Sequence, residues 1–433
     1  MYAALGEEMM FNILYSEKSG NMLEDKRLSF LGRSGQQWIE AEEGDMILLP
    51  EGCSLVMMPG HYPVGIDSDS TVSCREKTPH RASAVAMACL LPQGFTRTLL
   101  PATVAPQNAA EIPILGYTAV AGRGGKVMAA AIPTDEHRKW HPEHYNTPEL
   151  EQIVQSRLEH FPENRILRQL AHCSLNYSCF TAQNIFYGRW EGGIPTTAHC
   201  NARCLGCISR GHTSVPSPQE RLGFRPAVEE IVEVGLPHLE AASEGIISFG
   251  QGCEGDPALN ADLIASSIEI IRKSTGRGCI NINTNAGHTA GVKKLVDAGL
   301  DAIRVTLLSA SEEDYLAYHR PVNYGFGNVV HSISHARDNG VYVSINLLTI
   351  PGYTDSEEQV EAIIRLVHNT GIPMIQLRNL NIDPDLFFTS ITPRSAALGV
   401  RQMIEVFKQE GIKIASYTHS AHKGKGLVEM PDD

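Results

Sequence analysis

Three cysteines stand close together near the middle of the chain, in the segment GIPTTAHCNARCLGCISR at residues 193–210. Cys200, Cys204 and Cys207 have C-x3-C-x2-C spacing and follow a short run that predicts a strand. Three thiolates on one compact loop indicate a metal centre. Three ligands on a four-iron cluster leave one iron without a protein ligand, and a second molecule can bind and react at that iron.

The same cysteines could serve two other purposes. With His199 as a fourth ligand they could hold zinc, but structural zinc sites favour paired C-x2-C knuckles, and the chain shows no second half. A disulfide framework is disfavoured because the N-terminus lacks the basic start and apolar core of a secretory signal. The pattern therefore favours a 4Fe-4S cluster.

The segment resembles the signature of the radical S-adenosylmethionine (radical SAM) enzymes, whose three cysteines have this spacing. Thr197, Asn201 and Arg203 fit the form T-x-x-C-N-x-R-C that is common among them, while Gly206 replaces the usual aromatic residue before the third cysteine. The resemblance implies a cytoplasmic, oxygen-sensitive enzyme whose cofactors are a 4Fe-4S cluster and S-adenosylmethionine. Reductive cleavage of the sulfonium would give methionine and a 5'-deoxyadenosyl radical that abstracts a substrate hydrogen, with the electron coming from a flavodoxin or ferredoxin.

A glycine-rich turn follows the second predicted strand and contains Gly250, Gly252, Glu254 and Asp256. Glycine allows the backbone to approach a ligand closely, and a carboxylate can accept hydrogen bonds from an ammonium group. The turn resembles the family's GGEP element, which holds the methionyl amino group of the cofactor. Its order of glycine, acid and proline has Asp in place of Glu, and Glu254 lies two residues earlier, so either acid could take that role.

Polar residues alternate with apolar ones in the third and fourth predicted strands, which is unexpected in a buried parallel strand unless the polar residues line a site. Similar positions in the family contact the ribose and carboxylate of the cofactor, which assigns Asn285, Arg304 and Ser309 to it. The fifth strand resembles the turn that family members place against the adenine, which adds Asn346.

The sixth predicted strand ends in an unusually polar segment, and its residues are candidates for binding the substrate: Arg378, Asn379, Asn381 and Asp383. A surface loop with an Asp-Pro turn is the competing interpretation. Outside the signature, Cys253 could be a further thiol near the cofactor, a hydrogen donor or a small buried residue, and a second cluster at Cys173 and Cys179 is not favoured.

The elements that position these residues follow one pattern after residue 190, where short apolar runs alternate with helical periodicity. The predicted strands lie at 193–197, 245–250, 279–284, 302–308, 342–350 and 374–380. This alternation predicts an α/β fold, a partial (β/α)6 TIM-like barrel with reactive groups at the C-terminal ends of its strands. The predicted organisation is a separate β-rich N-terminal domain over 1–145, a helical connector over 146–190, the barrel over 191–418 and a tail over 419–433.

Composition limits the partners. The 433 residues include 36 basic and 49 acidic side chains, and the formal charge of -13 gives no global positive field for nucleic acid. The longest stretch without Asp, Glu, Lys or Arg is too polar for a membrane-spanning helix, so no membrane association is expected.

The substrate is where the sequence is least informative, because one barrel hosts many reactions. The N-terminal domain could present a peptide or protein, which is the favoured hypothesis, or close the cavity over a small metabolite. A non-catalytic iron–sulfur or zinc module for redox sensing or assembly is the alternative from another class.

Overall fold

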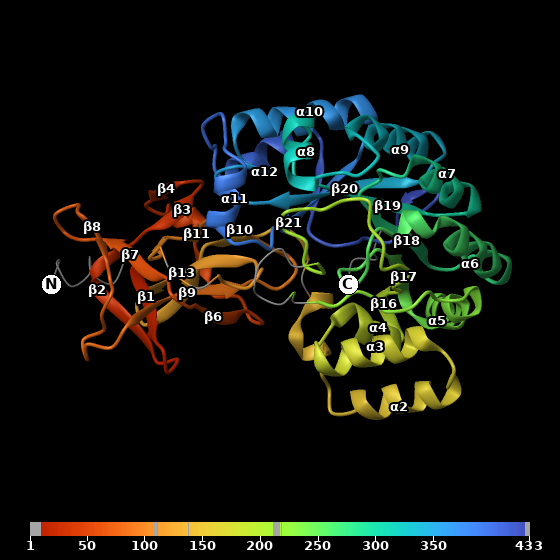
Figure 1. Ribbon diagram of the computed structural model, residues 1–433, viewed down its shortest axis with the longest axis horizontal. Coiled ribbons are helices and arrows are strands. Elements are labelled where there is room, and N and C mark those ends of the chain that lie inside the picture. The colour runs from red at the N-terminus through yellow and green to blue at the C-terminus, as the bar shows by residue number, and fades with distance from the viewer. Residues whose placement is uncertain are drawn as a thin grey trace.

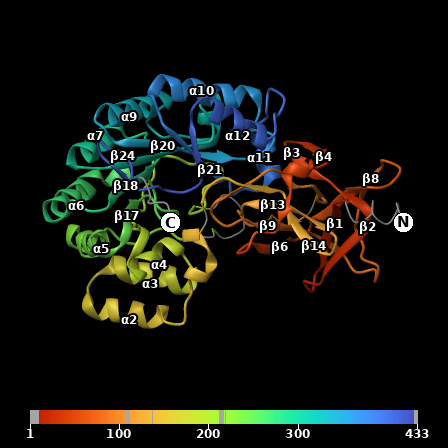
Figure 2. The same ribbon diagram turned by 180° about the vertical axis from the view of Figure 1, so that it is seen from behind.

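The computed structural model describes residues 10–107, 109, 111–136, 138–210, 217 and 219–428. A β-rich N-terminal region lies at one end of an elongated molecule and an α/β barrel at the other (Figure 1). The same arrangement is seen from behind (Figure 2). The predicted fold class, a partial α/β barrel with a β-rich N-terminal region, is confirmed. Residues 429–433 of the predicted tail lie outside the described residues.

The barrel is a curved sheet of seven strands whose neighbours all run parallel. In spatial order they are β16 (Arg189–Gly193), β17 (Ser243–Phe249), β18 (Cys279–Thr284), β19 (Ala302–Leu307), β20 (Tyr342–Thr349), β21 (Met374–Asn379) and β22 (Lys413–Ala415). No pairing joins β22 to β16 among the described strands, so the barrel is partial. The short strand β22 comes in addition to the six that the sequence predicted.

Helices connect the strands and lie on the outer face of the sheet (Figure 1). They are α5 (Val228–Ala241), α6 (Ala261–Ser274), α7 (Thr289–Ala298), α8 (Glu312–His319), α9 (Phe326–Asp338), α10 (Glu357–Thr370), α11 (Pro384–Ser390) and α12 (Val400–Gln409). Their apolar faces pack on strand residues such as Ile247, Ile303 and Ile345, all fully buried in one continuous core. Burial of this surface is the main stabilising contribution to the barrel.

The prediction for the first strand is wrong in its boundaries. The sequence placed it at 193–197, whereas β16 ends at Gly193 and the Ile194 N–H makes one more ladder bond to Ser248. Pro195 has no N–H to continue that ladder, so the chain leaves the sheet there. The cysteine loop therefore begins earlier than predicted, with Thr196 and Thr197 already outside the strand.

The N-terminal β region is built on a ten-stranded sheet whose pairings are antiparallel. Its strands are β1 (Asn12–Glu17), β2 (Met22–Phe30), β5 (Ile47–Leu48), β6 (Ser54–Met58), β7 (Tyr62–Ile66), β8 (Val72–Cys74), β9 (Ala84–Leu90), β12 (Thr103–Val104), β13 (Tyr117–Arg123) and β14 (Lys126–Ala129). Smaller sheets pair β10 (Phe95–Arg97) with β15 (Ala131–Pro133), and β3 (Gly32–Ser34) with β4 (Gln37–Ile39) and β11 (Leu100–Pro101).

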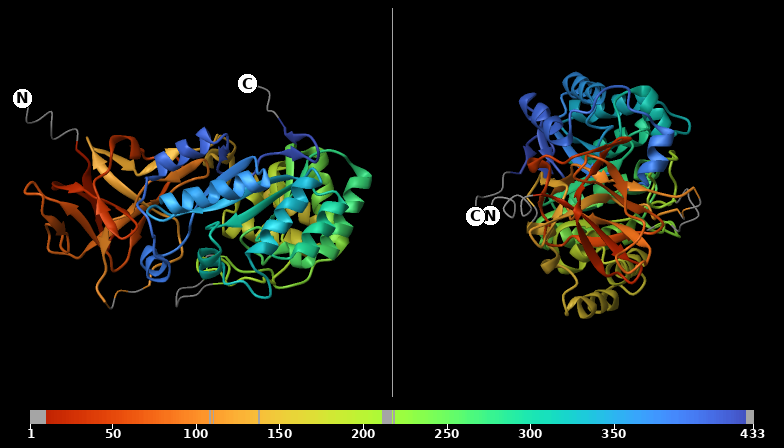
Figure 3. Two further views of the ribbon diagram at one scale, coloured as in Figure 1. Left: turned by 90° about the horizontal axis from the view of Figure 1, so that it is seen from above. Right: turned by 90° about the vertical axis from the view of Figure 1, so that its left-hand side faces the viewer.

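Three helices join the two regions: α2 (Leu150–His160), α3 (Arg165–Asn176) and α4 (Phe180–Tyr187). Their buried side chains belong to the barrel's core, and Asn164, the N-cap of α3, also donates to the Glu230 carbonyl of α5. The helices therefore form one body with the barrel, because α4 packs beside β16 and α3 beside α5. Figure 3 shows the three helices, in yellow, along one side of the barrel.

The N-terminal β region docks where β20 and β21 end. The buried Arg97 guanidinium of β10 donates to the Thr349 and Leu380 carbonyl oxygens, at 3.1 and 2.8 Å. The backbones also touch, since the Gly35 N–H donates to Pro351 and a Cβ at Gly352 would overlap the Gly35 nitrogen. The N-terminal region consequently forms a wall beside the C-terminal edge of the barrel sheet.

Within the described residues, no helix is long and apolar enough to cross a membrane.

Candidate active site

The three signature cysteines lie on the loop after β16 and line one cavity of about 320 Å³ at the C-terminal end of the strands. Two backbone hydrogen bonds attach this loop to the end of α8, from Arg203 to the His319 carbonyl at 2.9 Å and from Leu205 to the Tyr318 carbonyl at 3.0 Å. The loop is thus held from outside the sheet, with its three thiols directed at a common space.

The thiols are in a low-dielectric environment. Burial raises the pKa of Cys200 to about 11, and it raises the pKa of Cys204 further, with the neighbouring Cys200 and Cys207 sulfurs adding to the effect. Without a cation the Cys200 and Cys204 thiols therefore keep their protons, and binding a metal centre must displace them.

Two further side chains donate to the cysteine sulfurs. His319 Nδ1 lies 3.4 Å from Cys204 Sγ, and its Nε2 accepts a hydrogen bond from the Leu308 N–H, which assigns the ring proton to Nδ1. Burial lowers the pKa of His319 to about 3, so the ring is neutral and donates as an N–H dipole. Arg221 Nη2 lies 3.5 Å from Cys207 Sγ. Both donors favour negative charge on the sulfurs.

The three cysteines suit a four-iron cluster better than a single metal ion. Among the residues that the structure describes, no three His, Cys, Asp or Glu side chains converge closely enough to hold one metal ion. Tetrahedral zinc would require such convergence, whereas the thiolates of a four-iron cluster bind separate irons around a shared space. His199, the fourth ligand of the zinc alternative, lines a different cavity.

The glycine-rich turn forms the opposite wall of the cavity. Gly250 has φ +88°, a conformation that favours glycine, and a Cβ there would overlap the Asn283 carbonyl oxygen of β18. A Cβ at Gly255 would overlap the His199 carbonyl oxygen, and a Cβ at Gly252 would overlap the Gln219 and Ile208 side chains. The glycines therefore allow the turn to pack between β18 and the cysteine loop.

The two acids of the turn anchor backbone. Glu254 accepts five hydrogen bonds, from the Thr196 and Thr197 N–H groups, the Thr196 hydroxyl, and the Gly250 and Gln251 N–H groups. Burial raises its pKa to about 7 against these donors.

Asp256 accepts from the Thr284 hydroxyl and from the Ala258 and Asn285 N–H groups, and burial raises its pKa too. Glu254 lines the cavity and Asp256 does not. Both carboxylates thus hold the loops in place.

The cavity interior carries polar atoms that lack partners. Asn283, Arg304 and Asn346 all line it, and Asn283 Nδ2, Arg304 Nε and Asn346 Oδ1 are buried with no hydrogen-bond partner among the described residues. Orphaned buried polar atoms are costly, and a polar ligand would satisfy them. Two donors and one acceptor suit a cofactor with carboxylate, ribose and adenine groups.

Besides Asp256, two further predicted cofactor residues do not line the cavity. The Ser309 hydroxyl donates to Gln359 Oε1 at 2.6 Å and does not line the cavity. Asn285 Nδ2 donates to Asn201 Oδ1 at 2.7 Å, which ties the end of β18 to the cysteine loop. Ser309 and Asn285 thus each stabilise a wall of the cavity by a hydrogen bond to a residue that is distant in the sequence.

The four predicted substrate residues divide similarly. Arg378, Asn379 and Asn381 line the cavity, whereas Asp383 caps α11 by accepting from the Asp385 N–H. Asn379 also binds the N-terminal β region, because it accepts from the Arg97 N–H at 2.9 Å and donates to the Phe95 carbonyl at 3.0 Å.

Comparison with known proteins identifies the barrel. The model of the radical SAM superfamily matches residues 194–367, from the cysteine loop to α10. The barrel is a radical SAM domain. Such domains belong to enzymes that use a 4Fe-4S cluster and S-adenosylmethionine, which sets aside the non-catalytic alternative.

Solved structures that resemble this chain include radical SAM enzymes. A methylornithine synthase is 14% identical and covers 63% of this chain and 79% of its own, with a TM-score of 0.33. SuiB of Streptococcus suis, bound to the precursor peptide SuiA, is 13% identical with 63% and 67% coverage and a TM-score of 0.38. A radical SAM methyltransferase from Sphaerobacter thermophilus is 16% identical with 55% and 70% coverage and a TM-score of 0.40. A search among curated proteins gave no match.

Sequence reasoning missed several residues of the radical SAM domain's cavity. Asn283 was readable from the alternation in N-I-N-T-N, but no local pattern distinguishes His319 or Arg221, because each meets its cysteine only through the fold.

Proposed function

We propose that this protein is a radical SAM enzyme that cleaves S-adenosylmethionine reductively and abstracts hydrogen from a substrate bound beside the N-terminal β region. When bound, the reduced cluster and S-adenosylmethionine supply a 5'-deoxyadenosyl radical that can abstract hydrogen from carbon. The observation that carries the proposal is the single cavity that unites the three thiols with the unpartnered atoms of Asn283, Arg304 and Asn346.

The chain's residues have distinct tasks in this proposal. Cys200, Cys204 and Cys207 would hold the cluster, and the backbone of Gly250 and Gly252, which lines the same cavity, would bind the amino group of the cofactor. Arg304, Asn283 and Asn346 bind the cofactor's polar groups, while Glu254 and Asp256 keep the turn in position. Packing of the N-terminal β region on β20 and β21 reduces the access of water.

We propose a peptide or protein segment as the substrate, with a flavodoxin or ferredoxin as reductant and a cytoplasmic location. A cleft of about 280 Å³ between the two regions supports this choice, because Arg378, Asn379 and Asn381 line both the cleft and the cysteine cavity. Its outer wall includes Leu91 and Phe95 of the N-terminal β region. A substrate segment in this cleft would therefore reach the cofactor without passing through the sheet.

The test is anaerobic reconstitution with iron and sulfide, followed by dithionite and S-adenosylmethionine, with 5'-deoxyadenosine as the product measured. Wild-type protein and the exposed-cysteine control Cys74→Ala should form it, and Cys204→Ala should form none. Fully reconstituted wild-type protein that yields no 5'-deoxyadenosine would contradict the proposal. Deuterium transfer from a labelled peptide or metabolite into the product then distinguishes the two substrate classes.

A further inference from the structure

Two arginines line the cavity, the buried Arg304 of β19 and the half-buried Arg378 of β21. Arg304 Nη1 donates to Gln376 Oε1 and Thr418 Oγ1, at 3.0 and 2.8 Å. Arg378 Nη1 donates to Gln93 Oε1 and the Ser416 carbonyl, at 3.0 and 3.1 Å. All four acceptors are uncharged, so neither guanidinium has an ion-pair partner in the described part of the chain.

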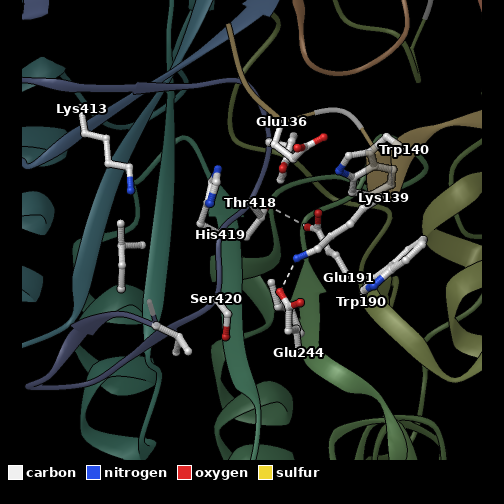
Figure 4. A pocket seen from close by; sticks show the side chains of 14 residues that line it. Glu136, Lys139, Trp140, Trp190, Glu191, Glu244, Lys413, Thr418, His419 and Ser420 are labelled. Carbon is white, nitrogen blue, oxygen red and sulfur yellow. Dashed lines mark hydrogen bonds and ion pairs between the residues drawn. The ribbon is translucent and has the colours of Figure 1, made fainter. Parts of the chain in front are cut away.

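One carboxylate acts on both cations. Glu191 of β16 is buried, and its Oε1 accepts hydrogen bonds from the Ser248 and Thr418 hydroxyls. Figure 4 shows the bond with Thr418, seen from the cavity at the opposite end of the strands.

Burial lowers the pKa of Arg378 to about 10, with the positive charge of Arg304 adding to the effect and Glu191 opposing it. Glu191 is the one carboxylate among the groups that shift the pKa of these two arginines, so the pair carries an excess of positive charge that a bound anion would offset.

The position of Arg378 indicates which anion its guanidinium can bind. Its side chain lines the cysteine cavity, the cleft between the two regions and a third cavity that contains Cys173, Cys179 and Cys253. Its Nε and Nη2 have no partner among the residues the structure describes. This edge of a guanidinium is a two-donor fork that matches a carboxylate or phosphate.

We infer that Arg378 binds an oxyanion of the substrate, a carboxylate or a phosphate, at the place where the cleft between the two regions meets the cysteine cavity. Arg304 lies deeper, at the level of Ser344 in the sheet register, and the cofactor's carboxylate is assigned to it. The rest of the substrate extends into the cleft, beside Leu91, Phe95 and Leu115. This inference rests on the proposed function and adds the substrate's charge to it.

The test uses the reconstituted full-length protein with saturating S-adenosylmethionine, so that the cofactor's own anion site is filled. Inorganic phosphate and succinate are titrated separately by calorimetry, at constant ionic strength maintained with sodium chloride. Wild-type protein should bind at least one probe, and Arg378→Gln should weaken it by at least about tenfold. The exposed control Arg365→Gln should leave affinity unchanged. Tighter succinate binding identifies a carboxylate, and tighter phosphate binding a phosphate.

A second variant does not depend on removing the arginine. Gln93→Glu places a carboxylate beside Arg378 Nη1 in a side chain of the same shape. It should abolish probe binding and raise the unfolding temperature of the probe-free protein. Wild-type protein that binds neither probe, or either variant binding like wild type, overturns the inference. The wild-type protein could instead make no 5'-deoxyadenosine and still bind a probe that neither variant binds. That result would preserve the anion site and reject the proposed function.

Discussion

Replacing Gly250 with alanine tests whether the glycine-rich turn is packed as the structure describes. Gly250 has φ +88°, and an alanine in a left-handed conformation costs about 1–2 kcal/mol. Its Cβ would also overlap the Asn283 carbonyl oxygen, which belongs to a central strand and cannot rotate away. Overpacking of this kind costs about 1–3 kcal/mol, so the expected loss of stability is about 2–5 kcal/mol.

The matched control is Gly276→Ala. Gly276 lies in the exposed connection between α6 and β18, has no positive φ and would place its Cβ in open space. The same substitution there is expected to be neutral or to stabilise the protein by up to about 1 kcal/mol, through the unfolded state. Urea unfolding of the cluster-free proteins compares the two variants with wild type under one condition.

Gly250→Ala also has a functional consequence, because the turn is a wall of the cavity that holds the cysteines. Displacing it from β18 should weaken S-adenosylmethionine binding in reconstituted protein, while iron content stays near wild type. A difference of less than about 1 kcal/mol between the two alanine variants would show that no close packing on Asn283 exists, and the reasoning would be refuted.

Three further predictions concern the thiols and the ion pairs. After reconstitution, Cys204→Ala should contain no iron or sulfide, whereas Cys253→Ala should contain both, because Cys253 lies behind the turn. Equal iron content in the two variants would contradict this prediction. His319→Leu should lower the cluster's reduction potential in an electron paramagnetic resonance titration, since it removes an N–H donor to Cys204 Sγ, and an unchanged potential would exclude that bond. Arg165 lowers the pKa of Glu230 to about 2 from 4.5, so their contribution to stability is present above pH 4.5 and disappears as pH falls toward 2. Glu230→Gln should flatten the dependence of urea unfolding on pH in that range, and a retained slope would assign it to other groups.

Much of the barrel could be predicted because its information is local. Strands and helices alternate along the sequence, and each strand from β17 to β21 lies within a few residues of its predicted range. The predicted first strand differs from β16 because Pro195 lacks the N–H that a strand ladder requires and ends the pairing there. Strand β22 is only three residues long, too short for periodicity to detect.

Of the side chains predicted to bind the cofactor, some line the cavity and others do not. Arg304 is predicted from polar positions in a buried strand and Asn346 from the resemblance of its strand end to the family's adenine turn, and both line the cavity. Ser309 is predicted on the same basis as Arg304, but its hydroxyl donates to Gln359, fifty residues away. The position of a residue along a strand predicts how deep it lies in the barrel. Its hydrogen-bond partner depends instead on which helix packs beside that strand.

The sequence by itself determined the chemistry that this protein can support. Cys200, Cys204 and Cys207 are close because they are neighbours in the chain, and no fold is needed to place three thiols on one loop. Only the tertiary structure decided what surrounds them. Gln93 reaches Arg378 across 285 residues, and a contact of that span leaves no periodic trace in the sequence, since it forms only when two separately folded regions pack together.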